Sequence, residues 1–267
     1  EMDKFLSICS YLFDEFEYAD IEQLNKKIVT NYECMLPVSV NAKILKNSQT
    51  IIYSFSEKKF KEYFQNIPSI RIRPEEARVI LDYLQKRYPD RYVDLALASQ
   101  FMPIKKSEKL SYFIIAYYHQ KQQKLRYNKI IKDFLLDDTI GKVILYLDEC
   151  RGKIRNCTYE DVSYSINKGI DLLNSDSSLY LEAKLCALNY ISDVAYETIT
   201  DQKKLLEIFE MYMRLFQQLN IYSVPDERYV DYVLDAVIFS TTIEKYSIQK
   251  RTNKLVSWLE KRTFSNL

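Results

Sequence analysis

Glycine is almost absent from this chain, and its scarcity restricts which folds and sites are possible. Only three glycines occur in 267 residues, at positions 141, 152 and 169. Phosphate-cradling loops, nucleophile elbows and tight hairpins use glycine for positive φ or for close backbone approach. We therefore expect helices and side chains, rather than glycine-dependent loops, to provide the functional contacts.

Apolar residues recur at steps of three and four through most of the chain, which is the spacing of amphipathic helices. Several helix starts carry their own local signals. Pro74 stands in a first turn followed by acids, Thr158 and Asp161 form a capping-box pattern, and Asp138 and Asp201 are placed as caps. The sequence therefore predicts an all-α protein built from helices of about 12–20 residues joined by short turns.

The N-terminal part of the pattern is less regular. The stripe from Phe5 to Phe16 predicts one amphipathic helix there. Between residues 34 and 55, Val38, Ala42 and Leu45 permit a helix, whereas residues 51–55 favour a short extended run.

A loose two-helix period follows in the C-terminal half, where 43 residues separate Thr158 from Asp201 and 46 separate Asp201 from Ser247. Stacked antiparallel helical hairpins of this length form either an α-solenoid of tetratricopeptide-like outline or an irregular helical bundle. No stretch carries the ordered positions of a tetratricopeptide repeat, so no family is assigned. We expect an N-terminal helical region, residues 1–152, and a C-terminal helical-hairpin region, residues 153–267, or one continuous array with a joint at Gly152.

The overall composition is that of a globular domain, with 47% hydrophobic and 28% charged residues and a formal net charge of +1. The five cysteines are odd in number and scattered, which favours free thiols in a reducing compartment. Residues 1–17 carry acids where a signal peptide is apolar, and no window approaches 18 uncharged apolar residues. We therefore expect a cytoplasmic protein with no membrane span.

The sequence lacks the short motifs of common enzymes, including the phosphate-binding, dinucleotide-binding, serine-nucleophile and zinc-protease patterns. The single histidine, His119, has no carboxylate close in sequence to orient it and fits a surface or half-buried position better than a catalytic one. Glu182 and Lys184 match a nuclease fragment by chance, because two residues apart on a helix they point to different sides. We predict no enzymatic activity, no catalytic residue, no metal site and no cofactor.

One interval stands out by its charge. Residues 103–132 contain eight Lys and Arg residues against one acid, Glu108, with tyrosines between them. Cations that hold phosphate beside rings that stack on bases suit single-stranded nucleic acid, while an acidic protein partner would suit the same charges. The candidate binding residues are Lys105, Lys106, Lys109, Tyr117, Tyr118, Lys121, Lys124, Arg126, Lys129 and Lys132.

The leading functional hypothesis is a non-enzymatic helical interaction module, a scaffold or part of a larger complex, that binds a protein or peptide partner. The 23 tyrosines suit protein interfaces, although the same rings can also space helices in a core. The alternative is a nucleic-acid-binding protein that uses the 103–132 interval. The sequence leaves the oligomeric state open.

Overall fold

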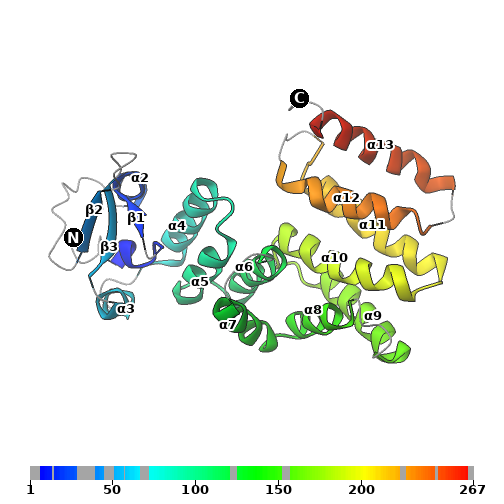
Figure 1. Ribbon diagram of the computed structural model, residues 1–267, viewed down its shortest axis with the longest axis horizontal. Helices are drawn as coiled ribbons and strands as arrows, with labels where there is room; N and C mark the ends of the chain where they lie inside the picture. Colours follow the sequence, from blue (N-terminus) through cyan, green and yellow to red (C-terminus); the bar gives the residue numbers. More distant parts are fainter. Residues whose placement is uncertain are drawn as a thin grey trace. The chain divides into compact units, whose positions relative to one another are not determined.

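The structure is a computed structural model whose chain divides into two compact units, residues 1–121 and 122–267 (Figure 1). The boundary expected at 152–153 lies inside the second unit, and residues 152–156 are outside the described part. The described ranges are 7–13, 15–28, 40–44, 51–56, 58–66, 72–120, 125–151, 157–222, 227–243 and 246–263.

The first unit combines a small antiparallel sheet with helices. Its strands lie in the order β1-β3-β2, and its helices α2 and α3 pack on β3. The elements are β1 (Phe16–Glu17), α2 (Tyr18–Ile28), β2 (Val40–Ile44), β3 (Ile51–Phe55), α3 (Lys58–Asn66), α4 (Pro74–Arg87), α5 (Tyr92–Phe101) and α6 (Lys106–His119).

One N-terminal expectation is wrong, and a helix that the sequence only permitted does not form at residues 40–44. Residues 40–44 form a strand rather than a helix, because β3 supplies hydrogen-bonding partners in a register that pairs Ala42 with Tyr53. The predicted helix from Phe5 to Phe16 is not continuous: among its described residues, helix covers 7–10, and Phe16 is a buried residue of β1. The extended run expected at 51–55 is confirmed as β3.

The second unit consists of successively packed helices, which confirms the all-α class for most of the described chain. α8 packs on α9 and α10, and α10 packs on α9, α11 and α12, so α8, α10 and α12 follow one another in a row. The helices are α7 (Leu125–Leu136), α8 (Thr139–Cys150), α9 (Tyr159–Ser175), α10 (Leu181–Thr198), α11 (Gln202–Gln218), a 3-10 turn η3 (Glu227–Tyr229), α12 (Val230–Ser240) and α13 (Tyr246–Thr263).

The expected helix caps of this unit are confirmed. Asp138 accepts a hydrogen bond from the Ile140 amide at 2.9 Å, and Asp201 accepts one from the Lys203 amide at 2.9 Å. Thr158 Oγ1 accepts from the amide of Asp161 at 3.2 Å. Each cap satisfies an amide that the helix itself leaves without a partner.

Small residues bring the helices of the second unit close together. Ala183, Ala187 and Ala195 of α10 are fully buried. At Gly169 of α9, an added Cβ would lie 2.8 Å from Ile191 Cδ1 of α10. At Gly141 of α8, it would lie 2.1 Å from the Leu135 carbonyl oxygen, so the α7–α8 turn requires glycine there.

The expectation of free thiols is wrong for two cysteines. Cys150, at the end of α8, forms a disulfide with Cys157, just before α9, and their Cα atoms are 6.2 Å apart. The bond therefore closes the α8–α9 turn. Cys9 and Cys186 are buried free thiols, as the sequence predicts.

Candidate interaction surfaces

The N-terminal part of the predicted basic interval lies at the start of α6. Lys105 and Lys106 are exposed, and Lys109 is half-buried, with its Nζ donating to the Gln100 carbonyl at 2.8 Å. The fourteen residues of α6 span about 21 Å at 1.5 Å per residue. Lys105 and Lys106 therefore lie a full helix length from His119.

The remaining cations of the interval lie in the second unit or outside the described residues. Lys121 and Lys124 are outside them, and Arg126 is described only as part of the α7 backbone. In α7, Lys129 is exposed and Lys132 is half-buried. The candidate cations are thus divided between two units.

The two candidate stacking rings of the interval lie in different environments. Tyr117 is 3% exposed, so its ring belongs to the core of the first unit. Tyr118 is half-buried and meets His119 edge-on, with ring centroids 4.9 Å apart. Every residue of α6 from Leu110 to Tyr117 is buried, and α6 packs on α5.

His119 is half-buried at the end of α6, where the sequence analysis expected a surface or half-buried histidine. Its ring stacks on Tyr92 with centroids 4.1 Å apart and an interplanar angle of 12°.

The nuclease-like pair on α10 does not form a joint site. Glu182 is buried, whereas Lys184 is half-buried and its Nζ donates to the Leu173 carbonyl at 3.0 Å. Burial lowers the pKa of Lys184 from its ordinary value, and Asp176 partly opposes that shift. Within the described part of the chain, no three His, Cys, Asp or Glu side chains are placed to hold a metal ion.

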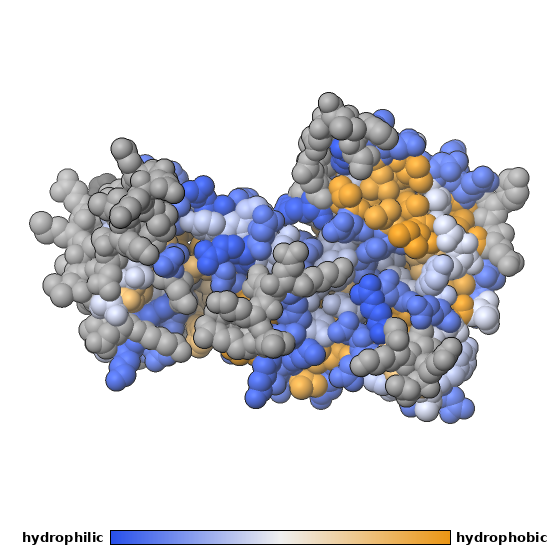
Figure 2. Space-filling view, in the orientation of Figure 1, coloured by the Kyte–Doolittle hydropathy of each residue, from blue (hydrophilic) through white to orange (hydrophobic). Residues whose placement is uncertain are grey.

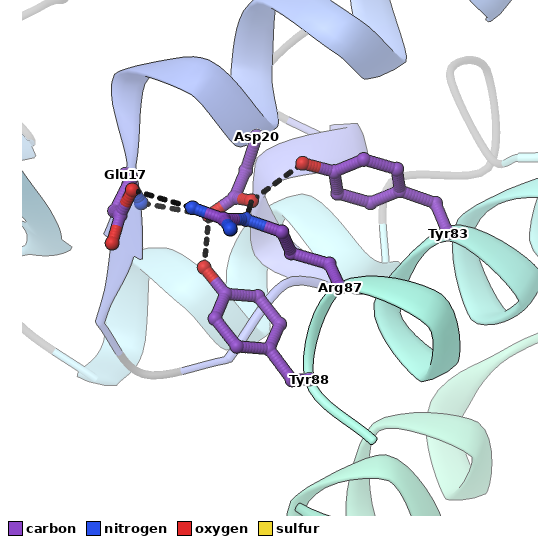
Figure 3. A network of polar contacts seen from close by, with 5 residues as sticks. All are labelled: Glu17, Asp20, Tyr83, Arg87 and Tyr88. Carbon is purple, nitrogen blue, oxygen red and sulfur yellow. Dashed lines mark hydrogen bonds and ion pairs between the residues drawn. The ribbon is translucent and has the colours of Figure 1, made fainter.

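A buried carboxylate organises the first unit (Figure 3). Asp20 of α2 is fully buried and accepts three hydrogen bonds, from Tyr83 Oη at 2.6 Å, Tyr88 Oη at 2.7 Å and the Glu17 amide at 2.8 Å. Arg87 lies beside it, donating to Glu17 at 3.0 Å, with its Nε 3.9 Å from Asp20. The network ties α2 to the end of α4.

The electrostatics of this network hold both tyrosines neutral. Burial, followed by the hydrogen bond to Asp20, raises the pKa of Tyr83 and of Tyr88 well above the ordinary tyrosine value. Glu17 in turn raises the pKa of Arg87. Three donors and a nearby guanidinium thus satisfy the buried carboxylate of Asp20.

A second polar network joins three helices of the second unit. Asn189 of α10 is 1% exposed; its Nδ2 donates to Asp235 of α12, and its Oδ1 accepts from Tyr212 of α11. The Tyr212 hydroxyl also lies 2.7 Å from Ser192 Oγ. Several tyrosines thus serve the core, as the sequence allowed, rather than an interface.

Polar contacts also fix how α10 and α12 lie against each other. Cys186 Sγ is 3.2 Å from Tyr232 Oη, and Asn189 bonds Asp235. Both pairs are 46 residues apart and their numbers rise together, so the two helices run parallel in a fixed register. This spacing matches the two-helix period of the sequence.

α12 is apolar on two sides, and one of them remains exposed. Its residues Tyr232, Val233, Ala236 and Phe239 are buried. At about 100° per residue, four other apolar residues fall on a separate arc of the helix. We call this arc the outer face of α12: Val230, Leu234, Val237 and Ile238.

The outer face lies at the surface, where Figure 2 shows a continuous hydrophobic area over α12. Leu234 and Ile238 are 44% and 49% exposed, and Val230 and Val237 are half-exposed. Tyr232, which meets α10, is about 160° from Leu234 around the helix. The outer face therefore points away from the preceding member of the row.

This surface is not among the predictions made from the sequence, although the sequence carries a signal for it. Residues 230–240 contain only two charged side chains, Asp231 and Asp235. A helix that is apolar on all sides is normally buried on all sides. The composition of residues 230–240 therefore indicates that a further packing layer or a partner covers the second side of the helix.

In the ranges that the structure describes, no helix combines the length and apolarity needed to cross a membrane. Comparison of the chain with protein-family models, with curated proteins and with solved structures finds no match.

Proposed function

We propose that this protein is a helical interaction module that binds a protein partner, and that the outer face of α12 is a contact surface. The observation that carries the proposal is the exposure of Leu234 and Ile238, at 44% and 49%, on a helix whose opposite side is already buried. Solvent-exposed apolar patches of this kind are typical of protein-binding sites.

The energetics support a partner on this face. Burying a whole Leu or Ile side chain is worth about 1.5–3 kcal/mol, so covering the exposed half gains roughly 1 kcal/mol for each residue. The four outer-face residues together supply about 3 kcal/mol. Micromolar affinity needs about 8 kcal/mol, so neighbouring surfaces of the partner contribute the remainder.

Packing within the second unit also supports the proposal. α8, α10 and α12 pack on one another in a row, and the outer face of α12 points away from α10. A partner helix on this face would continue that row.

A pull-down from a lysate of the source organism tests the proposal. The wild-type chain is compared with a Leu234→Glu, Ile238→Glu variant, in which both positions are exposed and glutamate is a good helix former. The matched control is Tyr159→Glu, Tyr164→Glu on α9, where the side chains are 63% and 68% exposed.

We expect one stoichiometric protein retained by the wild type and by the control and lost by the α12 variant. If the α12 variant retains the same proteins as the wild type, or if the wild type retains none, the proposal is wrong. Far-UV circular dichroism and the urea midpoint verify that all three chains are equally folded.

A further inference from the structure

The chemistry around the outer face of α12 narrows the kind of partner. Asp231 lies two turns before Ile238, so the two side chains fall on nearly one line along the helix. Asp231 is exposed, and Asp235 borders the same side while accepting from Asn189. α12 carries no lysine or arginine, so its own charges present a purely acidic edge beside an apolar stripe.

The shape of this surface fits a helix. The outer-face residues follow the i, i+4, i+7, i+8 spacing, which is the ridge on which a second helix packs. α12 has 11 residues and is about 16 Å long, so the stripe is one helix wide and three turns long. α8, α10 and α12 already repeat helix-on-helix packing along one row.

We infer that the partner segment is an amphipathic α-helix that lies along the outer face of α12 and carries Lys or Arg beside Asp231. This inference rests on the proposed function and specifies the partner of that same face. An apolar stripe on the partner covers Leu234 and Ile238, and its cation pairs with the acid at the edge. Opposite charges at the rim select the partner and its orientation more than they add affinity.

Two other occupants fit less well. A second copy contributing its own α12 would bring four acids and no cation of these helices into one contact. One 16 Å helix face is also much smaller than the roughly 800 Å² per partner that a stable dimer buries. Nucleic acid is disfavoured because an acidic edge repels phosphate.

Fluorescence anisotropy with defined peptides tests the inference. The probe is a labelled synthetic helix of about 18 residues with leucines at three- and four-residue steps and lysines elsewhere. A second peptide has glutamate in place of every lysine. Both are titrated with the wild type, with Leu234→Ser, Ile238→Ser, with Asp231→Lys and with the control Tyr164→Ser.

We expect the lysine peptide to bind the wild type and the control equally, and the glutamate peptide to bind about tenfold more weakly or less. The Leu234→Ser, Ile238→Ser variant should lose at least about tenfold in affinity for the lysine peptide. Asp231→Lys should reduce or reverse the preference between the two peptides. Unchanged affinity in the first variant, or an unchanged preference in the second, overturns the inference.

Two further results separate this inference from the proposed function. If the lysate partner depends on Leu234 and Ile238 but neither peptide does, the helix inference is wrong and the proposed function stands. Sedimentation velocity tests whether a second copy of the chain occupies the outer face of α12. A dimer of the wild type that is absent in the Leu234→Ser, Ile238→Ser variant assigns the face to a second copy and overturns the helix inference.

Discussion

The Asp20 network makes the strongest stability prediction for the first unit. Asp20→Ala removes a buried carboxylate that accepts hydrogen bonds from Tyr83, Tyr88 and the Glu17 amide. A hydrogen bond to a charged group contributes about 1.5–3 kcal/mol, but bonds in one network are not additive. The tyrosines are half-buried and reach water in part after truncation, so we expect a loss of about 3 kcal/mol.

More conservative changes in the same network should lower the free energy of unfolding by less than Asp20→Ala does. Asp20→Asn keeps the shape and an acceptor oxygen but loses the negative charge, which should cost about 1–2 kcal/mol. Tyr83→Phe and Tyr88→Phe each remove one bond and should cost about the same. The control is Asp82→Ala on α4, whose exposed ion pair with Lys86 should contribute less than about 0.5 kcal/mol.

Urea unfolding measures these free-energy losses, and hydrogen exchange measured by mass spectrometry shows which part of the chain is destabilised. Fragments covering α2 and α4 should lose protection in Asp20→Ala, whereas fragments of α10 should keep it. A stability loss below about 1 kcal/mol, or equal effects of Asp20→Ala and Asp82→Ala, would refute the reasoning.

Three further predictions concern pH, packing and thiol chemistry. The pKa values of Tyr83 and Tyr88 are raised in the folded state, so the contribution of these hydroxyls to the free energy of unfolding is complete below pH about 10 and falls above it. The Tyr83→Phe, Tyr88→Phe variant should therefore lose less stability toward urea at alkaline pH than the wild type does, and an identical loss would contradict this. Gly141→Ala should destabilise the second unit by about 1–3 kcal/mol, because its Cβ would meet the Leu135 carbonyl; a thermal midpoint equal to that of the wild type would be inconsistent with this packing. Burial, and to a smaller extent the charge of Glu182, raises the pKa of the Cys186 thiol. Iodoacetamide at pH about 8 should therefore alkylate Cys186 only after unfolding. Rapid alkylation of Cys186 in the native chain would contradict its burial.

Features encoded by neighbouring residues could be predicted from the sequence. The caps at Asp138, Thr158 and Asp201 depend on side chains two or three residues from the amides they satisfy. The helical period of α9 to α13 is similarly local. These signals gave the class of the fold and the arrangement of the second unit in successive hairpins.

Features that depend on distant residues could not be predicted. Asp20 meets Tyr83 and Tyr88 across 63 and 68 residues, and no local pattern pairs them. β2 becomes a strand because β3 lies beside it, although its residues also permit a helix. The burial of a candidate binding residue also depends on distant residues: Tyr117 lies between cations in sequence, but its ring is buried in the first unit.

Site-specific photocrosslinking tests the central claim, that a protein partner covers the outer face of α12, most directly. A benzophenone amino acid at position 238 is compared with the same residue at position 164 on α9, after irradiation in a lysate of the source organism. We predict one protein adduct from position 238 that is absent from position 164. No adduct at 238, or the same adducts from both positions, would contradict the account.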